Sequence, residues 1–177
     1  VPEPILGAAA TDMRPLVIGT TRDEMLLFTT FDPSRAGWTD TEVDRQFSMR
    51  FGASSDKAVS EYRRLRPDTN ASQLISAMQT DEMFRVPAQQ LASNRQAPTW
   101  MYLFDAPSTA FGGVLGSCHG SDIPYMFDNL AQPGVSRFLG DDPAQHVAEQ
   151  FSEALIEFAR SGEPDWHPYD THQRNTQ

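Results

Sequence analysis

Two short segments carry side chains that could perform general acid–base chemistry together. Residues 19–24 end in Glu24 and directly follow the apolar run 15–18. Residues 116–127 contain His119 in a loop bounded by glycines, which let the backbone approach other groups closely. A carboxylate can accept a hydrogen bond from the Nδ1–H of a histidine, which fixes its tautomer and stabilises the imidazolium. Such a pair could activate a hydroxyl nucleophile if both groups reach one site.

The order of the carboxylate and the histidine along the chain indicates which kind of catalytic triad they could belong to. An acid that precedes a histidine matches the order Ser…Asp/Glu…His of the α/β-hydrolase triad. The nucleophile of that triad is a serine in the pattern Gly-x-Ser-x-Gly, which occurs nowhere in the 177 residues. We therefore expect the nucleophile to lie in sequence upstream of this chain.

Each residue taken alone has a simpler explanation. Asp23 and Glu24 could be solvated loop charges, as acidic residues usually are, and His119 could be an ordinary surface histidine. Cys118 precedes His119, but neighbours in an extended loop point to opposite sides and rarely act as nucleophile and base. We expect Cys118 to be a small buried side chain.

No metal site is expected from the histidines near the end of the chain. His167 and His172 stand on either side of Asp170, a spacing that matches no zinc pattern, and no cysteine accompanies them. We interpret these residues as part of a solvated polar tail.

Composition excludes some classes of partner. The net charge is −10, and an acidic chain repels phosphate backbones, so we expect no nucleic-acid binding. No apolar run has the length of a membrane span. With 39% hydrophobic and 21% charged residues, the chain can build an ordinary core.

The pattern of elements is typical of an α/β layer protein. Residues 15–20 and 98–104 are the expected strands, and residues 105–122 the loop that carries His119. Residues 1–14 are expected to be irregular. Thr39, Asn70 and Asp142 have the sequence context of helix caps. The expected helices span residues 39–52, 56–66, 70–91 with a break near Pro87, and 142–162. Two strands are few for a complete α/β sheet, so we expect absent sequence to complete it.

Together these segments resemble the type-B carboxylesterase/cholinesterase family, whose bacterial members include the para-nitrobenzyl esterases. Five landmarks occur in the order of that family, and they cover nearly the whole chain. They are residues 15–28 with the Asp-Glu pair, Thr80-Asp81 with Phe84 and Pro87, the aromatic segment 99–104, the histidine segment 119–127, and residues 158–169.

The resemblance implies an α/β-hydrolase fold, with a central, mostly parallel sheet flanked by helices. Residues 1–177 would be the C-terminal portion of a single domain that lacks the nucleophile-bearing N-terminal part. Glu24 would be the acid and His119 the histidine of a Ser-Glu-His triad. The substrate would be a small-molecule ester, and neither cofactor nor metal would be needed.

The family also implies roles for residues near the histidine. Asp122 stands where the family usually has Glu, and we interpret it as a carboxylate that supports the triad without joining it. Phe111, Leu115 and Phe127 are predicted substrate-pocket residues. Met25 stands where the family often has Gly, so the turn after the acid could differ.

The sequence also allows an absent part that carries a nucleophile other than serine. Two further interpretations assign the chain no hydrolysis at all. One is a catalytically inactive relative of cholinesterases that serves adhesion or interaction. The other is a self-sufficient, non-enzymatic binding domain, which would unfold cooperatively by itself. The esterase interpretation instead predicts that the isolated 177 residues are inactive and fold poorly without the N-terminal portion, their partner in the complete enzyme.

Overall fold

Two parallel strands form the centre of the computed structural model, which describes residues 5–177. Strand β1 (Leu16–Thr21) pairs with β2 (Thr99–Phe104), and the register runs from Leu16 opposite Thr99 to Thr21 opposite Phe104. Both predicted strands are therefore confirmed to within a residue. Because the strands are parallel, the segments that follow Thr21 and Phe104 leave the sheet at the same edge.

Helices account for most of the remaining structure, and one lies where an irregular segment was predicted. Residues 5–11 are helical because a run of alanines has high helix propensity and because this helix packs against α6; residues 1–4 of that prediction lie outside the described part. The helices are α1 (Ile5–Thr11), α2 (Leu26–Thr29), α3 (Asp40–Phe51), α4 (Ser55–Leu65), α5 (Ala71–Thr80), α6 (Val86–Asn94), α7 (Ile123–Met126), α8 (Val135–Leu139) and α9 (Gln145–Ser161). Short turns are η1 (Pro33–Arg35), η2 (Gly52–Ser54), η3 (Asp81–Arg85) and η4 (Ala110–Gly113).

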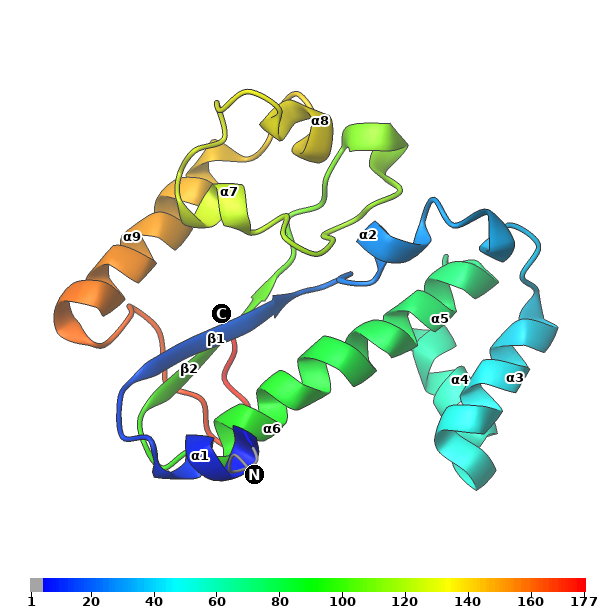
Figure 1. Ribbon diagram of the computed structural model, residues 1–177, viewed down its shortest axis with the longest axis horizontal. Helices are drawn as coiled ribbons and strands as arrows, with labels where there is room; N and C mark the ends of the chain where they lie inside the picture. Colours follow the sequence, from blue (N-terminus) through cyan, green and yellow to red (C-terminus); the bar gives the residue numbers. More distant parts are fainter. Residues whose placement is uncertain (1–4) are drawn as a thin grey trace.

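The sheet lies between two helical layers (Figure 1). Successive side chains of a strand point to opposite faces. On one face Tyr102 and Phe104 meet Phe151 of α9, with ring centroids 5.0 and 6.2 Å away. On the other face Met101 packs with Ala88 of α6. The small sheet is thus covered on both sides, as in α/β folds.

A second core lies away from the sheet, among helices α3, α4 and α5 at the right of Figure 1. Its fully buried members include Phe47, Leu74 and Ile75. This core fixes α4 and α5 to each other. From the end of α5, the hydroxyl of Thr80 reaches the turn after β1.

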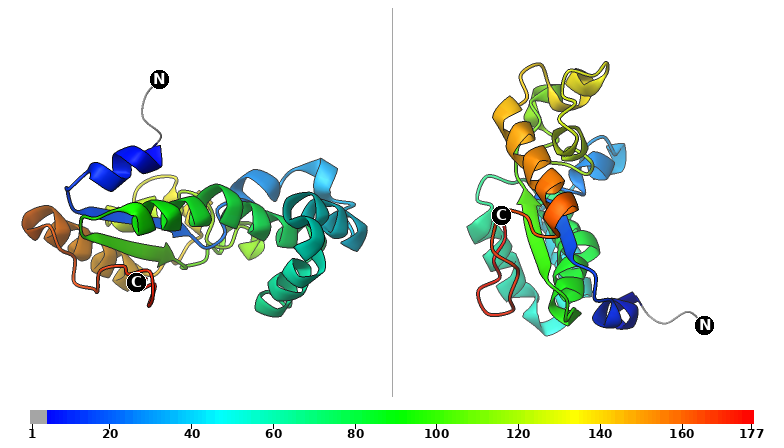
Figure 2. Two further views of the ribbon diagram at one scale, coloured as in Figure 1. Left: turned by 90° about the horizontal axis from the view of Figure 1, so that it is seen from below. Right: turned by 90° about the vertical axis from the view of Figure 1, so that its left-hand side faces the viewer.

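The segment after α9 has neither helix nor strand, yet it returns to the sheet (Figure 2). The N–H of Tyr169 donates to the carbonyl of Thr99 at 2.8 Å, and Gln177 exchanges two backbone hydrogen bonds with Met101 and Leu103. The expected polar tail therefore covers part of the free edge of β2.

Helix α5 begins as its sequence predicted, whereas α3 and α9 do not. The side chain of Asn70 accepts from the N–H of Gln73 at 2.9 Å, and the side chain of Gln73 accepts from the N–H of Asn70. The side chain of Thr39 makes no such bond, and the N–H of Glu42 donates instead to the backbone carbonyl of Thr39 at 2.9 Å. The Glu42 carboxylate, which would complete a capping box, pairs with Arg45. Helix α9 starts at Gln145 rather than at the predicted Asp cap.

The break predicted near Pro87 is a widened turn in a continuous helix. Figure 1 shows α5 running into α6, and the turn between them, η3, has π-helical hydrogen bonding. Pro87 has no N–H, and its ring crowds the carbonyl four residues earlier, which an ordinary α-helix cannot accommodate without a kink.

Gly19 has a packing role in the sheet. It lies opposite Tyr102, and a Cβ at this position would clash with the Tyr102 ring. The missing side chain lets the aromatic ring lie across β1, from where its hydroxyl reaches Asp122 at 3.1 Å.

We therefore expect Gly19→Ala to lower the free energy of unfolding of the intact protein by about 1–3 kcal/mol, the usual cost of overpacking. Gly37→Ala is the matched control, because its Cβ would meet nothing within 4 Å. Denaturant titration of both variants measures the difference. Equal stability of the two would show that the Tyr102 ring does not depend on Gly19.

Asn70 caps α5 with its side chain, whereas Thr39 does not cap α3, and this difference can be tested. Asn70→Ala should cost about 1 kcal/mol of unfolding free energy, because it removes a bond that satisfies the first turn of α5. Thr39→Ala should change stability by less than about 0.5 kcal/mol, because Thr39 caps nothing. The same titration tests both variants, and a larger loss for Thr39→Ala would contradict this assignment.

Candidate active site

Glu24 lies in the tight turn that follows β1. Its Oε1 accepts a hydrogen bond from the N–H of Thr21 at 2.7 Å, and the residue is only 4% exposed. The turn therefore fixes one carboxylate oxygen and leaves the other, Oε2, for a second partner.

That partner is His119, from the loop after β2. Its Nδ1 lies 2.6 Å from Glu24 Oε2, and its backbone N–H donates to the carbonyl of Glu24 at 3.3 Å. The His119 side chain is 48% exposed. With Nδ1 engaged by the carboxylate, Nε2 is the ring nitrogen left to exchange a proton with a reacting group.

Two phenylalanines contact the imidazole of His119. The ring of Phe28, from α2, has its centroid 5.4 Å away, and the ring of Phe84, from η3, has its centroid 5.3 Å away. Their roles were not predicted, although both stand in segments that carried the family resemblance.

Asp23 could have been a solvated loop charge by its sequence, but it is buried and joins the two loops. Its N–H donates to the carbonyl of Ser117 at 2.9 Å, and its Oδ2 accepts from the N–H of Ser117 at 3.1 Å. Arg22 Nε and Arg66 Nη1 lie 2.9 and 3.0 Å from its carboxylate oxygens. This buried carboxylate is therefore paired with cations, as burial of a charge requires.

The close approach of the loops depends on Gly116. Its φ is +55°, and a Cβ there would lie 2.5 Å from Oδ2 of Asp23. Glycine alone meets both the backbone and the space requirement at this point. The repeated glycines of the histidine loop were the sequence signal for such an approach.

Asp122 lies close to the pair without bonding to it as a third member. Its Oδ2 accepts from the hydroxyl of Tyr102 at 3.1 Å. Burial raises the pKa of Asp122, and the nearby charge of Glu24 raises it further, while Tyr102 and His119 act in the opposite direction. Its supporting role stays a prediction.

Cys118 is fully buried, which confirms the sequence prediction. Burial is the main reason that its pKa is raised to about 11. The thiol is therefore neutral near pH 7 and has no thiolate with which to act as a nucleophile.

The three predicted pocket residues have different surroundings. Leu115 is fully buried, whereas Phe111 and Phe127 are exposed. Phe111 packs edge-to-face against Phe31, with ring centroids 5.2 Å apart. Their part in substrate binding stays a prediction.

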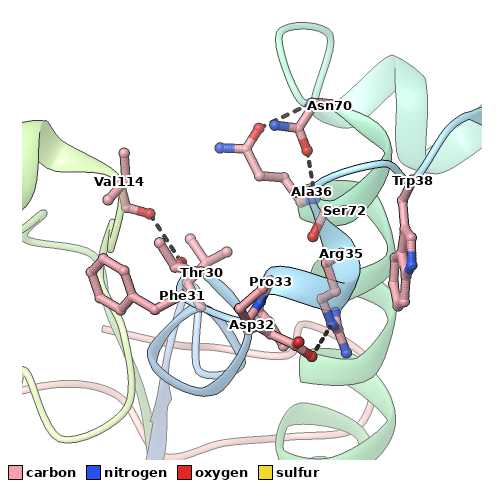
Figure 3. A pocket seen from close by; sticks show the side chains of 13 residues that line it. Thr30, Phe31, Asp32, Pro33, Arg35, Ala36, Trp38, Asn70, Ser72 and Val114 are labelled. Carbon is pink, nitrogen blue, oxygen red and sulfur yellow. Dashed lines mark hydrogen bonds and ion pairs between the residues drawn. The ribbon is translucent and has the colours of Figure 1, made fainter.

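Two cavities lie beside the pair rather than around it. One, of about 450 Å³, is lined by residues that include Thr30, Phe31 and Arg35 (Figure 3). The other, of about 800 Å³, extends along Asp23 and Arg66. The lining residues of both include neither Glu24 nor His119, so neither cavity identifies the substrate site.

Two features are absent from residues 5–177. Within this range no group of three or more His, Cys, Asp and Glu side chains is arranged to hold a metal ion. No helix there has both the length and the apolar character needed to cross a bilayer.

Comparisons with known proteins identify the family of this chain. The model of the carboxylesterase family matches residues 1–176. A phenmedipham hydrolase from Pseudarthrobacter oxydans is 31% identical over 156 residues, which cover 84% of this chain and 31% of that protein. A para-nitrobenzyl esterase from Bacillus subtilis is 30% identical over an alignment of 187 residues, covering 99% of this chain and 36% of that protein.

Solved structures give the same result. A carboxylesterase from Geobacillus stearothermophilus superposes with a TM-score of 0.73 at 27% identity, over 90% of this chain and 35% of that one. A PNB esterase superposes with a TM-score of 0.66 at 30% identity, over 92% of this chain and 33% of that one. The chain thus spans about a third of the length of these relatives. It has the α/β-hydrolase fold in part, and it belongs to the carboxylesterase family.

Proposed function

We propose that this chain supplies the acid and the histidine of a Ser-Glu-His triad in a carboxylic ester hydrolase. The observation that carries the proposal is the 2.6 Å contact between Glu24 Oε2 and His119 Nδ1. The His119 side chain is half-exposed and its Nδ1 is engaged by Glu24, which leaves Nε2 for a serine hydroxyl from another segment. Relatives named as an esterase and a hydrolase support the reaction class.

The proposed reaction has two halves that share one histidine. His119 Nε2 takes the proton of the serine hydroxyl while the serine oxygen attacks the ester carbonyl, and it returns the proton to the departing alcohol. Water then attacks the acyl-serine, again with His119 as base, and releases the acid. Glu24 keeps the imidazole in the required tautomer and stabilises its charged form. An oxyanion hole elsewhere in the enzyme holds the negative oxygen of the tetrahedral intermediate.

Under this proposal the third member of the triad, the serine, belongs to another segment. The 177 residues contain no Gly-x-Ser-x-Gly and match about a third of the length of their relatives. We propose that they are the C-terminal portion of one hydrolase domain and that an N-terminal portion brings the serine. The isolated chain would accordingly be inactive.

Substitution of the pair in the intact enzyme tests the proposal. His119→Ala should lower kcat for an ester substrate on the order of 10⁴-fold, because the base is lost. Glu24→Gln should lower it by a smaller factor, because the imidazole remains but loses its charged partner. Steady-state hydrolysis of an activated ester measures both effects.

Exposed residues of the same types on α9 are the controls for this experiment. His146→Ala and Glu153→Gln should leave kcat within about twofold of the parent, as surface substitutions usually do. A His119→Ala enzyme with nearly full activity would remove this histidine from the proposed triad.

A further inference from the structure

Residues 80–85 make three separate contacts with the segments that carry Glu24 and His119. These residues end α5 and form the π-helical turn η3 (Asp81–Arg85). π-Helical turns within α-helices are frequently found at functional sites.

Two of the contacts hold the turn that contains Glu24. The hydroxyl of Thr80, a fully buried residue, accepts from the N–H of Met25 at 3.1 Å. Arg85 Nη2 donates to the carbonyl of Arg22 at 2.9 Å and to that of Thr21 at 3.4 Å. Backbone groups before and after Glu24 are therefore both satisfied by this one segment.

The third contact reaches the histidine. The ring of Phe84 lies with its centroid 5.3 Å from the centroid of the His119 ring, at an interplanar angle of 45°. Because the imidazole is half-exposed, an aromatic neighbour restricts the orientations that its ring can adopt.

The π-helical turn η3 is itself held in place by a contact with α4. Asp81 pairs with Arg85 within the turn, and it also accepts from the hydroxyl of Tyr62, on α4, at 2.6 Å. The π hydrogen bond runs from the N–H of Val86 to the carbonyl of Asp81. Phe84 and Arg85 are adjacent in sequence, yet Phe84 contacts His119 and Arg85 contacts the turn that contains Glu24.

We propose that η3 positions the acid and the histidine relative to each other, with Phe84 as the positioning residue for His119 and Arg85 as that for the Glu24 turn. The inference rests on the proposed function, because it assigns a role within the same reaction. A histidine displaced by even 1 Å from its reacting geometry can lose roughly a hundredfold in rate.

The test is a set of variants at Phe84 in the intact enzyme. Phe84→Leu keeps an apolar side chain but removes the ring, and Phe84→Tyr keeps the ring. Met83→Leu is the control, since Met83 lies in the same turn but is 58% exposed. The readouts are kcat, KM and the rate at which a fluorophosphonate labels the serine.

We expect Phe84→Leu to lower kcat and the labelling rate by roughly tenfold or more, with KM within about twofold, because ring placement matters in the transition state rather than in substrate binding. Phe84→Tyr should restore both rates, and Met83→Leu should match the parent. If Phe84→Leu does not fold, Phe84→Met is measured by the same readouts.

A Phe84→Leu enzyme that loses only thermal stability, with kcat and labelling unchanged, would overturn the positioning role. His119→Ala in the same series separates this failure from a failure of the proposed function. If His119→Ala is inactive while Phe84→Leu is fully active, the positioning role of Phe84 is wrong and the triad assignment stands. If His119→Ala is active, the triad assignment itself is wrong.

Discussion

The site depends on the exchange of two hydrogen bonds between Asp23 and Ser117. One joins backbone to backbone and the other joins the carboxylate to a backbone N–H, at 2.9 and 3.1 Å. These bonds hold together two loops that are 94 residues apart in sequence. Glu24 directly follows Asp23, and His119 follows Ser117 by two residues, so the same bonds bring Glu24 and His119 together. A carboxylate buried in this position would be unfavourable without its arginine partners, so Arg66 is part of the constraint.

The two-stranded sheet makes that exchange possible. Parallel pairing from Leu16–Thr99 to Thr21–Phe104 delivers both loops to the same edge. Arg22 N–H and the hydroxyl of Ser117 both donate to the carbonyl of Phe104 at 2.9 Å, so the two loops are joined where they leave the strands. Packing of the sheet between α6 and α9 holds this end of the strands in place. Gly19 therefore matters to the site through the Tyr102 ring, whose hydroxyl bonds to Asp122.

Local patterns predicted the strands, the capping box at Asn70 and the meeting of Glu24 with His119, because each depends on residues close in sequence or on the order of known motifs. The role of Asp23 could not be predicted in this way. Its partner Arg66, which follows the last residue of α4, is 43 residues away in sequence, and only the folded chain brings the two together.

The contacts of η3 could not be predicted from the sequence either. A helix read with 3.6 residues per turn gives a different set of residues facing the site once a π turn intervenes. Pro87 signalled a disturbance but not its form, so Phe84 and Arg85 received no role. Helix α1 was missed for another reason: prolines and Gly7 near the start suggested an irregular segment, whereas packing against α6 stabilises the alanine run as a helix.

The central claim is that Glu24 and His119 serve a serine nucleophile from outside these 177 residues. The most direct measurement is mass spectrometry of the native protein after treatment with a fluorophosphonate, with peptide mapping of the label. We predict one label on a serine outside this chain, in an active enzyme that contains residues 1–177. If an N-terminal portion is present but takes up no label, the protein is a catalytically inactive relative. If the 177 residues fold and function alone without taking up label, the account is contradicted.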